Sequence, residues 1–184
     1  AQKLDKAVNA ELPPLKLERA SFTTQLEVDE ASPGPQGIDR IEFWVQTNPG
    51  TRPGPLMKVA SGGELSRFLL ALKVVLADRG SAPTLVFDEI DTGIGGRAAE
   101  AVGKKLKSLS RSNQVLCVTH LPQIATFADH HYLIEKKAVG GRTRTGVHLI
   151  TGDERTEEVA RMLSGAKLTE TSRKHAEQML KTNA

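Results

Sequence analysis

A short polar segment, Ser61-Gly62-Gly63-Glu64, stands directly before apolar residues with helical spacing. Ser61 followed three residues later by Glu64 is a capping box, in which each side chain satisfies a free backbone N–H at a helix start. The capping box does not explain the two glycines, because Gly weakens a helix by up to about 1 kcal/mol relative to Ala. Glycines there expose backbone N–H groups and the positive end of the helix dipole to an anion such as phosphate. The capping box does not compete with a phosphate site, and the local chemistry alone leaves the phosphate site open.

Two carboxylates, Asp88 and Glu89, directly follow the short apolar run 84–87. Ligands of parallel α/β sheets bind at the carboxyl ends of the strands. Asp88 is a candidate to hold Mg²⁺ through water, since Mg²⁺ keeps much of its hydration shell. Glu89 is a candidate to orient or polarise an attacking water molecule. The alternative is a solvated loop in which Glu89 caps the next helix.

A second apolar run, 115–118, ends in the polar pair Thr119-His120. If the two runs are neighbouring strands, His120 comes near Glu89. A single histidine at a strand end is more often structural than catalytic. Its position at the end of the second strand nevertheless favours a role beside the carboxylates.

Two glycine-rich segments suggest nucleotide sites and are rejected. Residues 93–98 fit G-x-G-x-x-A, but polar residues separate them from the strand and the required acidic residue is missing beyond them. We therefore expect a turn that enters a helix. Gly103 and the two lysines after it resemble the end of a P-loop, but Ala98 stands where Gly belongs and Lys105 where Ser or Thr belongs. No Walker A motif is found in this sequence.

The remaining polar residues give weaker signals. The five histidines show no metal-site spacing with Cys117, and we expect His130 and His131 to be surface or sheet residues. One basic set could contact DNA phosphates, although a solvated hairpin is the favoured interpretation. This set consists of Lys136, Lys137, Arg142 and Arg144.

The elements that position these groups begin with a small antiparallel β region. Leu4, Val8 and Leu12 predict a short helix, or the end of a longer one, that Pro13-Pro14 terminates. Strands are predicted over 16–29 and 38–46, with loops over 32–37 and 48–55.

The pattern changes after Lys58. A helix is predicted from Leu65 through Asp78, and another one carries Val102, Leu106 and Leu109 on one face. Buried strands are predicted over 84–87 and 115–118, two final strands over 131–135 and 142–150, and helices near 153–163 and 168–181. Strand–helix–strand alternation predicts an α/β fold with a mainly parallel sheet flanked by helices.

Composition sets the class of protein. The 184 residues fit one domain, and 39% hydrophobic and 26% charged residues are normal for a soluble globular protein. The formal charge of +3 is compatible with nucleic-acid binding without proving it. The single cysteine, Cys117, excludes an internal disulfide and favours a reducing compartment. With no apolar run near the roughly 20 residues of a membrane span and no signal peptide, cytoplasm is expected. The missing initial Met predicts a fragment.

The order and spacing of these motifs resemble the ATP-binding-cassette ATPases of the SMC-like family. Ser61 to Glu64 resembles the signature motif, Asp88 and Glu89 resemble the Walker B carboxylate and the catalytic glutamate, and His120 resembles the switch histidine. Five longer segments are similar to the bacterial DNA-repair branch of that family in particular. They are residues 47–50, 58–67, 87–91, 118–123 and 160–163.

The resemblance implies the C-terminal lobe of an ATPase head. Residues 1–12 would end a returning coiled-coil helix, 13–184 would form the lobe, and the Walker A motif would lie in an N-terminal half. Two heads would sandwich two ATP molecules, with Mg²⁺ near Asp88. The nucleotide-binding residues would be Ser61, Gly62, Gly63, Glu64 and Asp88. Of these, Ser61 and Gly63 would contact the γ-phosphate on the other head. Glu89 and His120 would act on the ATP of their own head.

The resemblance also implies the role and partners. The role would be repair of DNA double-strand breaks by recombination, in the cytoplasm at the nucleoid and away from any membrane. The partners would be the N-terminal half, a second head, DNA and recombination proteins such as RecA. Two alternatives remain: an ATP-gated structural DNA tether, or the head of another SMC-family protein. Gly95 stands where most members carry an interface Asp, so that cross-dimer contact is in doubt.

Overall fold

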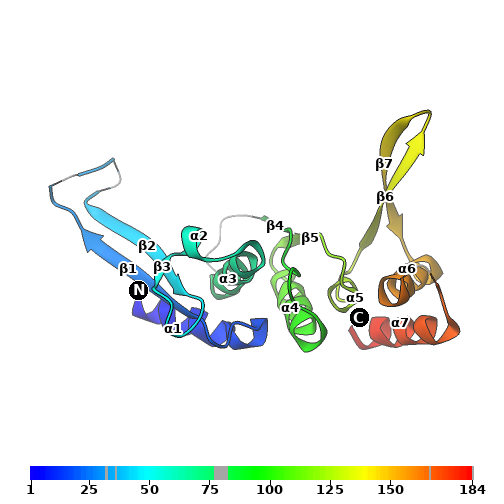
Figure 1. Cartoon of the computed structure of the whole chain (residues 1–184), viewed down its shortest axis with the longest axis horizontal. Coiled ribbons are helices and arrows are strands. Elements are labelled where there is room, and N and C mark those ends of the chain that lie inside the picture. The colour runs from blue at the N-terminus through cyan, green and yellow to red at the C-terminus, as the bar shows by residue number, and fades with distance from the viewer. Residues whose placement is uncertain (32, 36, 77–82, 166, 184) are drawn as a thin grey trace. The chain divides into compact units, whose positions relative to one another are not determined.

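The computed structural model describes residues 1–31, 33–35, 37–76, 83–165 and 167–183. The chain divides into two compact units, Ala1–Thr119 and His120–Ala184, which are described separately (Figure 1).

The first unit begins with a helix fastened to a strand. Helix α1 (Gln2–Glu11) buries Val8, and the 3₁₀ turn η1 (Pro13–Leu15) follows it, as the proline pair predicted. The Asn9 side chain donates to the Phe22 carbonyl at 2.8 Å and accepts from the Phe22 N–H at 2.9 Å. The Asp5 carboxylate accepts from the N–H and the hydroxyl of Thr24 at 2.9 and 2.6 Å. Whether α1 continues into a coiled coil stays a prediction.

The predicted antiparallel region is confirmed. Strand β1 (Ser21–Val28) pairs with β2 (Asp39–Gln46), which pairs with β3 (Gly54–Pro55). The first strand begins five residues later than predicted. Leu17 is buried outside the strand, and an odd spacing separates it from Phe22, so the two cannot share one face of a strand. Lys16, with φ 59°, turns the chain before the strand starts.

The rest of the first unit carries the predicted strand–helix–strand alternation. The short helix α2 (Leu56–Val59) precedes α3 (Gly62–Val75), and the strand β4 (Thr84–Phe87), helix α4 (Gly96–Leu109) and strand β5 (Gln114–Cys117) follow. Strands β4 and β5 are parallel, with Phe87 beside Cys117. The end of the predicted helix at Asp78 lies outside the described residues.

Strand β4 is buried on one face only, and the same face of β5 is partly buried. Leu85 and Phe87 are buried, whereas the exposed fractions of Val86 and Leu116 are 67% and 48%. The prediction of buried strands therefore holds for one face of β4 only, because no described segment covers the face that carries Val86 and Leu116.

The second unit is a hairpin with helices. The short helix α5 (Pro122–Ala125) precedes the antiparallel strands β6 (His131–Val139) and β7 (Arg142–Ile150), and the helices α6 (Gly152–Ser164) and α7 (Glu170–Asn183) follow. The two helices pack through Val159, Ala160 and Ala176. Arg155 of α6 donates to the Ala128 carbonyl at 2.7 Å. The predicted final strands and helices are confirmed, and β6 extends four residues further than predicted.

Candidate functional site

The predicted capping box starts helix α3. Ser61 is the N-cap, and the Glu64 carboxylate accepts from the Ser61 N–H at 3.1 Å and from its hydroxyl at 2.7 Å. Ser61 and Gly62 are exposed, whereas Gly63 is buried. The exposed start of this helix offers backbone N–H groups to an anion.

The structure gives different reasons for glycine at positions 62 and 63. A Cβ atom at Gly63 would lie 2.7 Å from the Thr92 carbonyl oxygen, which is backbone and cannot move aside easily. A Cβ atom at Gly62 would lie 3.4 Å from Glu89 Oε2, the end of a flexible side chain. Packing therefore requires Gly63, and the close approach of a ligand remains a reason only for Gly62.

The carboxylates Asp88 and Glu89 lie in a tight turn after β4. Glu89 has φ 56°, its N–H donates to Asp88 Oδ1 at 3.0 Å, and the Thr92 N–H donates to the Glu89 carbonyl at 3.2 Å. Both carboxylate side chains are exposed, whereas Ile90 is fully buried and Asp91 is 3% exposed. The turn thus presents two acidic groups to solvent while its second half is anchored inside.

Helix α3 holds this turn from one side. The Ser66 hydroxyl donates to the Asp88 carbonyl at 3.3 Å, and Arg67 Nη1 donates to the Thr92 carbonyl at 3.0 Å. Arg67 is 7% exposed, and burial lowers the pKa of its guanidinium while the Glu64 charge opposes this. The helix that carries the signature-like segment is therefore joined directly to the turn that carries Glu89.

Asp91 holds the turn from the other side, and sequence reasoning gave it no role. Thr119 Oγ1 donates to Asp91 Oδ2 at 2.6 Å. The strand register contains a signal that could have found this contact. Because Phe87 pairs with Cys117, the residues after both strands emerge side by side. A hydroxyl beyond one strand can then meet a carboxylate beyond the other.

His120 directly follows Thr119 and is the first residue of the second unit. The condition for its approach to Glu89 is met, since β4 and β5 are neighbours. The approach itself stays a prediction.

Cysteine chemistry does not compete with this site. Burial, helped by the charges of Asp91 and Asp88, raises the pKa of the Cys117 thiol to about 12. The thiol is therefore protonated at neutral pH and is a poor nucleophile and metal ligand.

The nucleotide-like glycine segments have structural explanations. Gly93 and Gly96 have φ 73° and 53°, and Gly95 is the N-cap of α4, which confirms the predicted turn into a helix. Gly103 lies inside α4 and is buried there, so the following lysines are not part of a phosphate loop.

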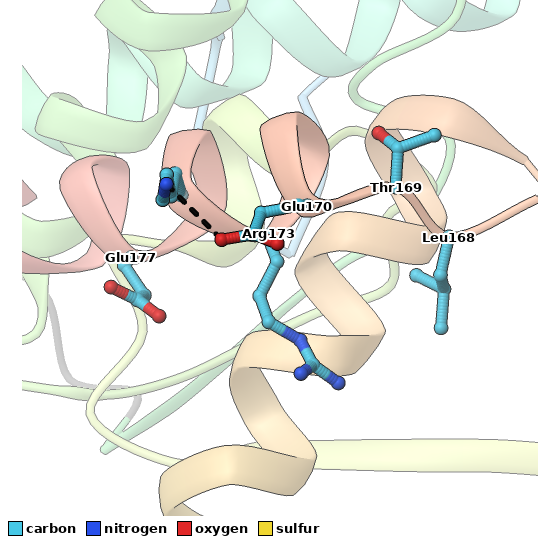
Figure 2. A pocket seen from close by; sticks show the side chains of 6 residues that line it. Leu168, Thr169, Glu170, Arg173 and Glu177 are labelled. Carbon is cyan, nitrogen blue, oxygen red and sulfur yellow. Dashed lines mark ion pairs between the residues drawn. The ribbon is translucent and has the colours of Figure 1, made fainter.

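A surface pocket in the second unit lies at the start of α7 (Figure 2). Lys174 pairs with Glu170 at 3.1 Å, and Arg173 pairs with Glu157. The residues that line it are Leu168, Thr169, Glu170, Arg173, Lys174 and Glu177. None of these was singled out from the sequence, and all six are exposed.

The bond between Thr119 and Asp91 can be tested directly. In Thr119→Val, a side chain of similar shape removes the hydroxyl and leaves the buried Asp91 carboxylate with one hydrogen bond fewer. We expect the free energy of unfolding to fall by about 1–3 kcal/mol, measured by denaturant titration. Thr119→Ser keeps the hydroxyl and serves as the control. Equal stability of Thr119→Val and the unchanged protein would show that the bond does not anchor the turn.

Solved structures with a similar fold include SMC heads, whereas no family model matches the chain. A Pyrococcus yayanosii Smc head domain with a coiled coil and joint has a TM-score of 0.60 and 20% identity, over 89% of this chain and 29% of that one. A structure from work on ATP-driven dimerization of SMC ATPases has a TM-score of 0.54 and 17% identity, over 90% of this chain and 94% of that one. The chain therefore has the α/β fold of an SMC-like head lobe.

Curated relatives identify the family within this class. The DNA repair protein RecN of Halalkalibacterium halodurans is 42% identical over 183 residues, which are 98% of this chain and 32% of that protein. RecN of Streptomyces coelicolor is 44% identical over 193 residues, 99% of this chain and 34% of that protein. The chain belongs to the RecN family, and it spans about a third of the length of these relatives. The predicted DNA-repair branch is confirmed.

Proposed function

We propose that the chain is the C-terminal lobe of an ATPase head that hydrolyses ATP at a head–head interface and acts in recombinational repair of DNA double-strand breaks. The observation that carries this proposal is the turn after β4. It presents Asp88 and Glu89 to solvent and is bonded to the helix that starts at Ser61. The family of SMC-like ATPases supports the reaction class.

The residues of the site have separate roles in this proposal. Glu89 orients and polarises the attacking water, and His120 stabilises charge on the γ-phosphate. Ser61, Gly62 and Gly63 offer the start of α3 to the ATP of the opposing head, and Glu64 holds Ser61 in place.

Magnesium fits the acidic end of β4. Asp88 is an exposed carboxylate there, and the described residues contain no cluster of three or more acidic, histidine or cysteine ligands. Mg²⁺ is commonly bound by one or two carboxylates, waters and substrate phosphates, so a single carboxylate suffices. When bound, Mg²⁺ neutralises phosphate charge.

The partners follow from the same proposal. The Walker A motif is supplied by an N-terminal half, residues 1–12 end a coiled-coil helix and 13–184 form the lobe, and a second copy completes the dimer. DNA is the substrate on which the assembly acts, and recombination proteins such as RecA are its further partners. Among the described helices, none is long and apolar enough to cross a membrane. The role in DNA repair supports a location in the cytoplasm at the nucleoid.

The proposal is tested by separating the two halves of the head. We expect the 184-residue chain alone to show no ATP hydrolysis, because it contains no P-loop to hold the β- and γ-phosphates. Adding the separately expressed N-terminal half should restore hydrolysis, measured as phosphate release. Circular dichroism confirms that the chain is folded in both samples. Hydrolysis by the folded chain alone would contradict the proposal.

A further inference from the structure

The tip of the β6–β7 hairpin is a narrow ribbon. The register runs without interruption from His131 beside Ile150 to Val139 beside Arg142. The two-residue turn Gly140-Gly141 has φ 59° and 76°, and such a pair of positive φ angles is typical of a type I′ turn. Figure 1 shows the hairpin rising from α6 and α7, with its tip pointing away from both helices.

The tip of the hairpin, residues 135–145, carries as large an excess of positive over negative side chains as the whole chain does. Residues 135–145 contain four cationic side chains and one carboxylate, an excess of three. The whole chain has 25 basic and 22 acidic residues, which is also an excess of three. The remaining residues are therefore balanced in formal charge. The four cationic side chains, Lys136, Lys137, Arg142 and Arg144, are all exposed.

The register places cations on both faces of the ribbon. Lys137 lies directly opposite Arg144, while Lys136 lies opposite Thr145 on the other face. Like charges directly opposite each other destabilise an antiparallel pair. Glu135 pairs with Lys137 at 2.8 Å and compensates only one of these cations. A solvated hairpin gains nothing from the arrangement, whereas a polyanion would relieve the repulsion.

We infer that this basic tip, residues 135–145, binds duplex DNA by its phosphates, an inference that rests on the proposed role in DNA repair. The major groove of B-DNA is about 12 Å wide and admits a two-stranded β-ribbon. Cations on both faces of such a ribbon meet the phosphates of both groove walls. Contacts to phosphates carry no sequence information, so the tip binds DNA of any sequence.

The test uses the full-length protein that contains this chain. Lys136→Gln/Arg144→Gln removes one cation from each face and leaves the Glu135–Lys137 pair intact. Lys167→Gln/Lys181→Gln is the matched control, because it removes the same charge from exposed positions outside the hairpin. Affinity for a duplex of random sequence is measured over a salt series. Thermal unfolding shows that both variants are folded.

We expect the hairpin variant to bind more weakly and to reduce the slope of log affinity against log salt by about 2, because each lost phosphate contact removes about 0.9. The control should keep the original slope. An unchanged slope in the hairpin variant overturns the inference. The inference is also overturned if the hairpin variant keeps its binding to DNA but loses binding to anionic phospholipid vesicles, because the tip would then bind lipid phosphates instead.

A separate measurement, ATP hydrolysis without DNA, tests the proposed ATPase activity independently of DNA binding by the tip. ATP hydrolysis without DNA should be the same in the hairpin variant and in the unchanged protein, because the tip holds no residue of the catalytic turn. Absent hydrolysis in both proteins would count against the proposed reaction and leave the DNA result valid. Hydrolysis lost only in the hairpin variant would overturn the assignment of the tip to DNA binding.

Discussion

Glu89→Gln is expected to reduce ATP hydrolysis by the complete head at least about 100-fold, which is the usual contribution of a positioned acid–base group. Glutamine keeps the size of the side chain but cannot accept the proton of an attacking water. The measurement is steady-state phosphate release by the full-length protein. Binding of ATP should persist, since Glu89 is not among the residues proposed to hold the nucleotide.

Glu27→Gln makes the same chemical change at an exposed position of β1 and should leave hydrolysis intact. The pair also separates the proposed enzyme from an ATP-gated structural tether. If cells carrying Glu89→Gln repaired double-strand breaks normally while hydrolysis was lost, turnover would be unnecessary and the tether would be the better description. Hydrolysis at the original rate would instead remove Glu89 from the catalytic role.

Gly63→Ala is expected to lower the free energy of unfolding by about 1–3 kcal/mol, the usual range for an overpacked core. The added methyl group would lie 2.7 Å from the Thr92 carbonyl oxygen, so helix α3 and the turn after β4 would have to separate. Hydrolysis should fall as well, because the turn carries Glu89. Denaturant unfolding and phosphate release measure the two effects.

Gly62→Ala is the matched control for stability. Among the described residues, its methyl group would meet only Glu89 Oε2, at 3.4 Å, and a side-chain end can move aside. This variant should be no less stable than the unchanged protein. If Gly63→Ala and Gly62→Ala unfolded at the same denaturant concentration as the unchanged protein, the close packing of α3 on the turn would be refuted.

The capping box and the two strand ends could be predicted from the sequence because their rules are local. Ser61 and Glu64 are three residues apart, and the apolar run before Asp88 marks the end of its strand without any knowledge of the rest of the fold. The similarity of these segments to a known family then predicted the head lobe and its DNA-repair branch, and the relatives confirm both.

Contacts between distant residues could not be predicted in the same way. The hydrogen bond between Thr119 and Asp91 joins residues 28 positions apart, and either side chain alone is equally compatible with a solvated loop. The need for Gly63 depends on a carbonyl group of another segment, so the sequence favoured ligand approach where packing is the cause. The exposed side of Val86 could not be predicted because three consecutive apolar residues, Leu85 to Phe87, show no usable period.

The backbone conformation of Glu89 affects how this position would change under selection for stability. Its φ of 56° is a conformation that costs a residue other than glycine about 1–3 kcal/mol. Glycine would occupy the position without that cost but would lack the carboxylate. Selection for thermal stability alone would therefore favour the loss of this side chain, and an enzyme evolved that way would become more robust as it became inactive. In the proposed mechanism, the carboxylate of Glu89 is needed for its chemistry although the backbone at this position favours glycine.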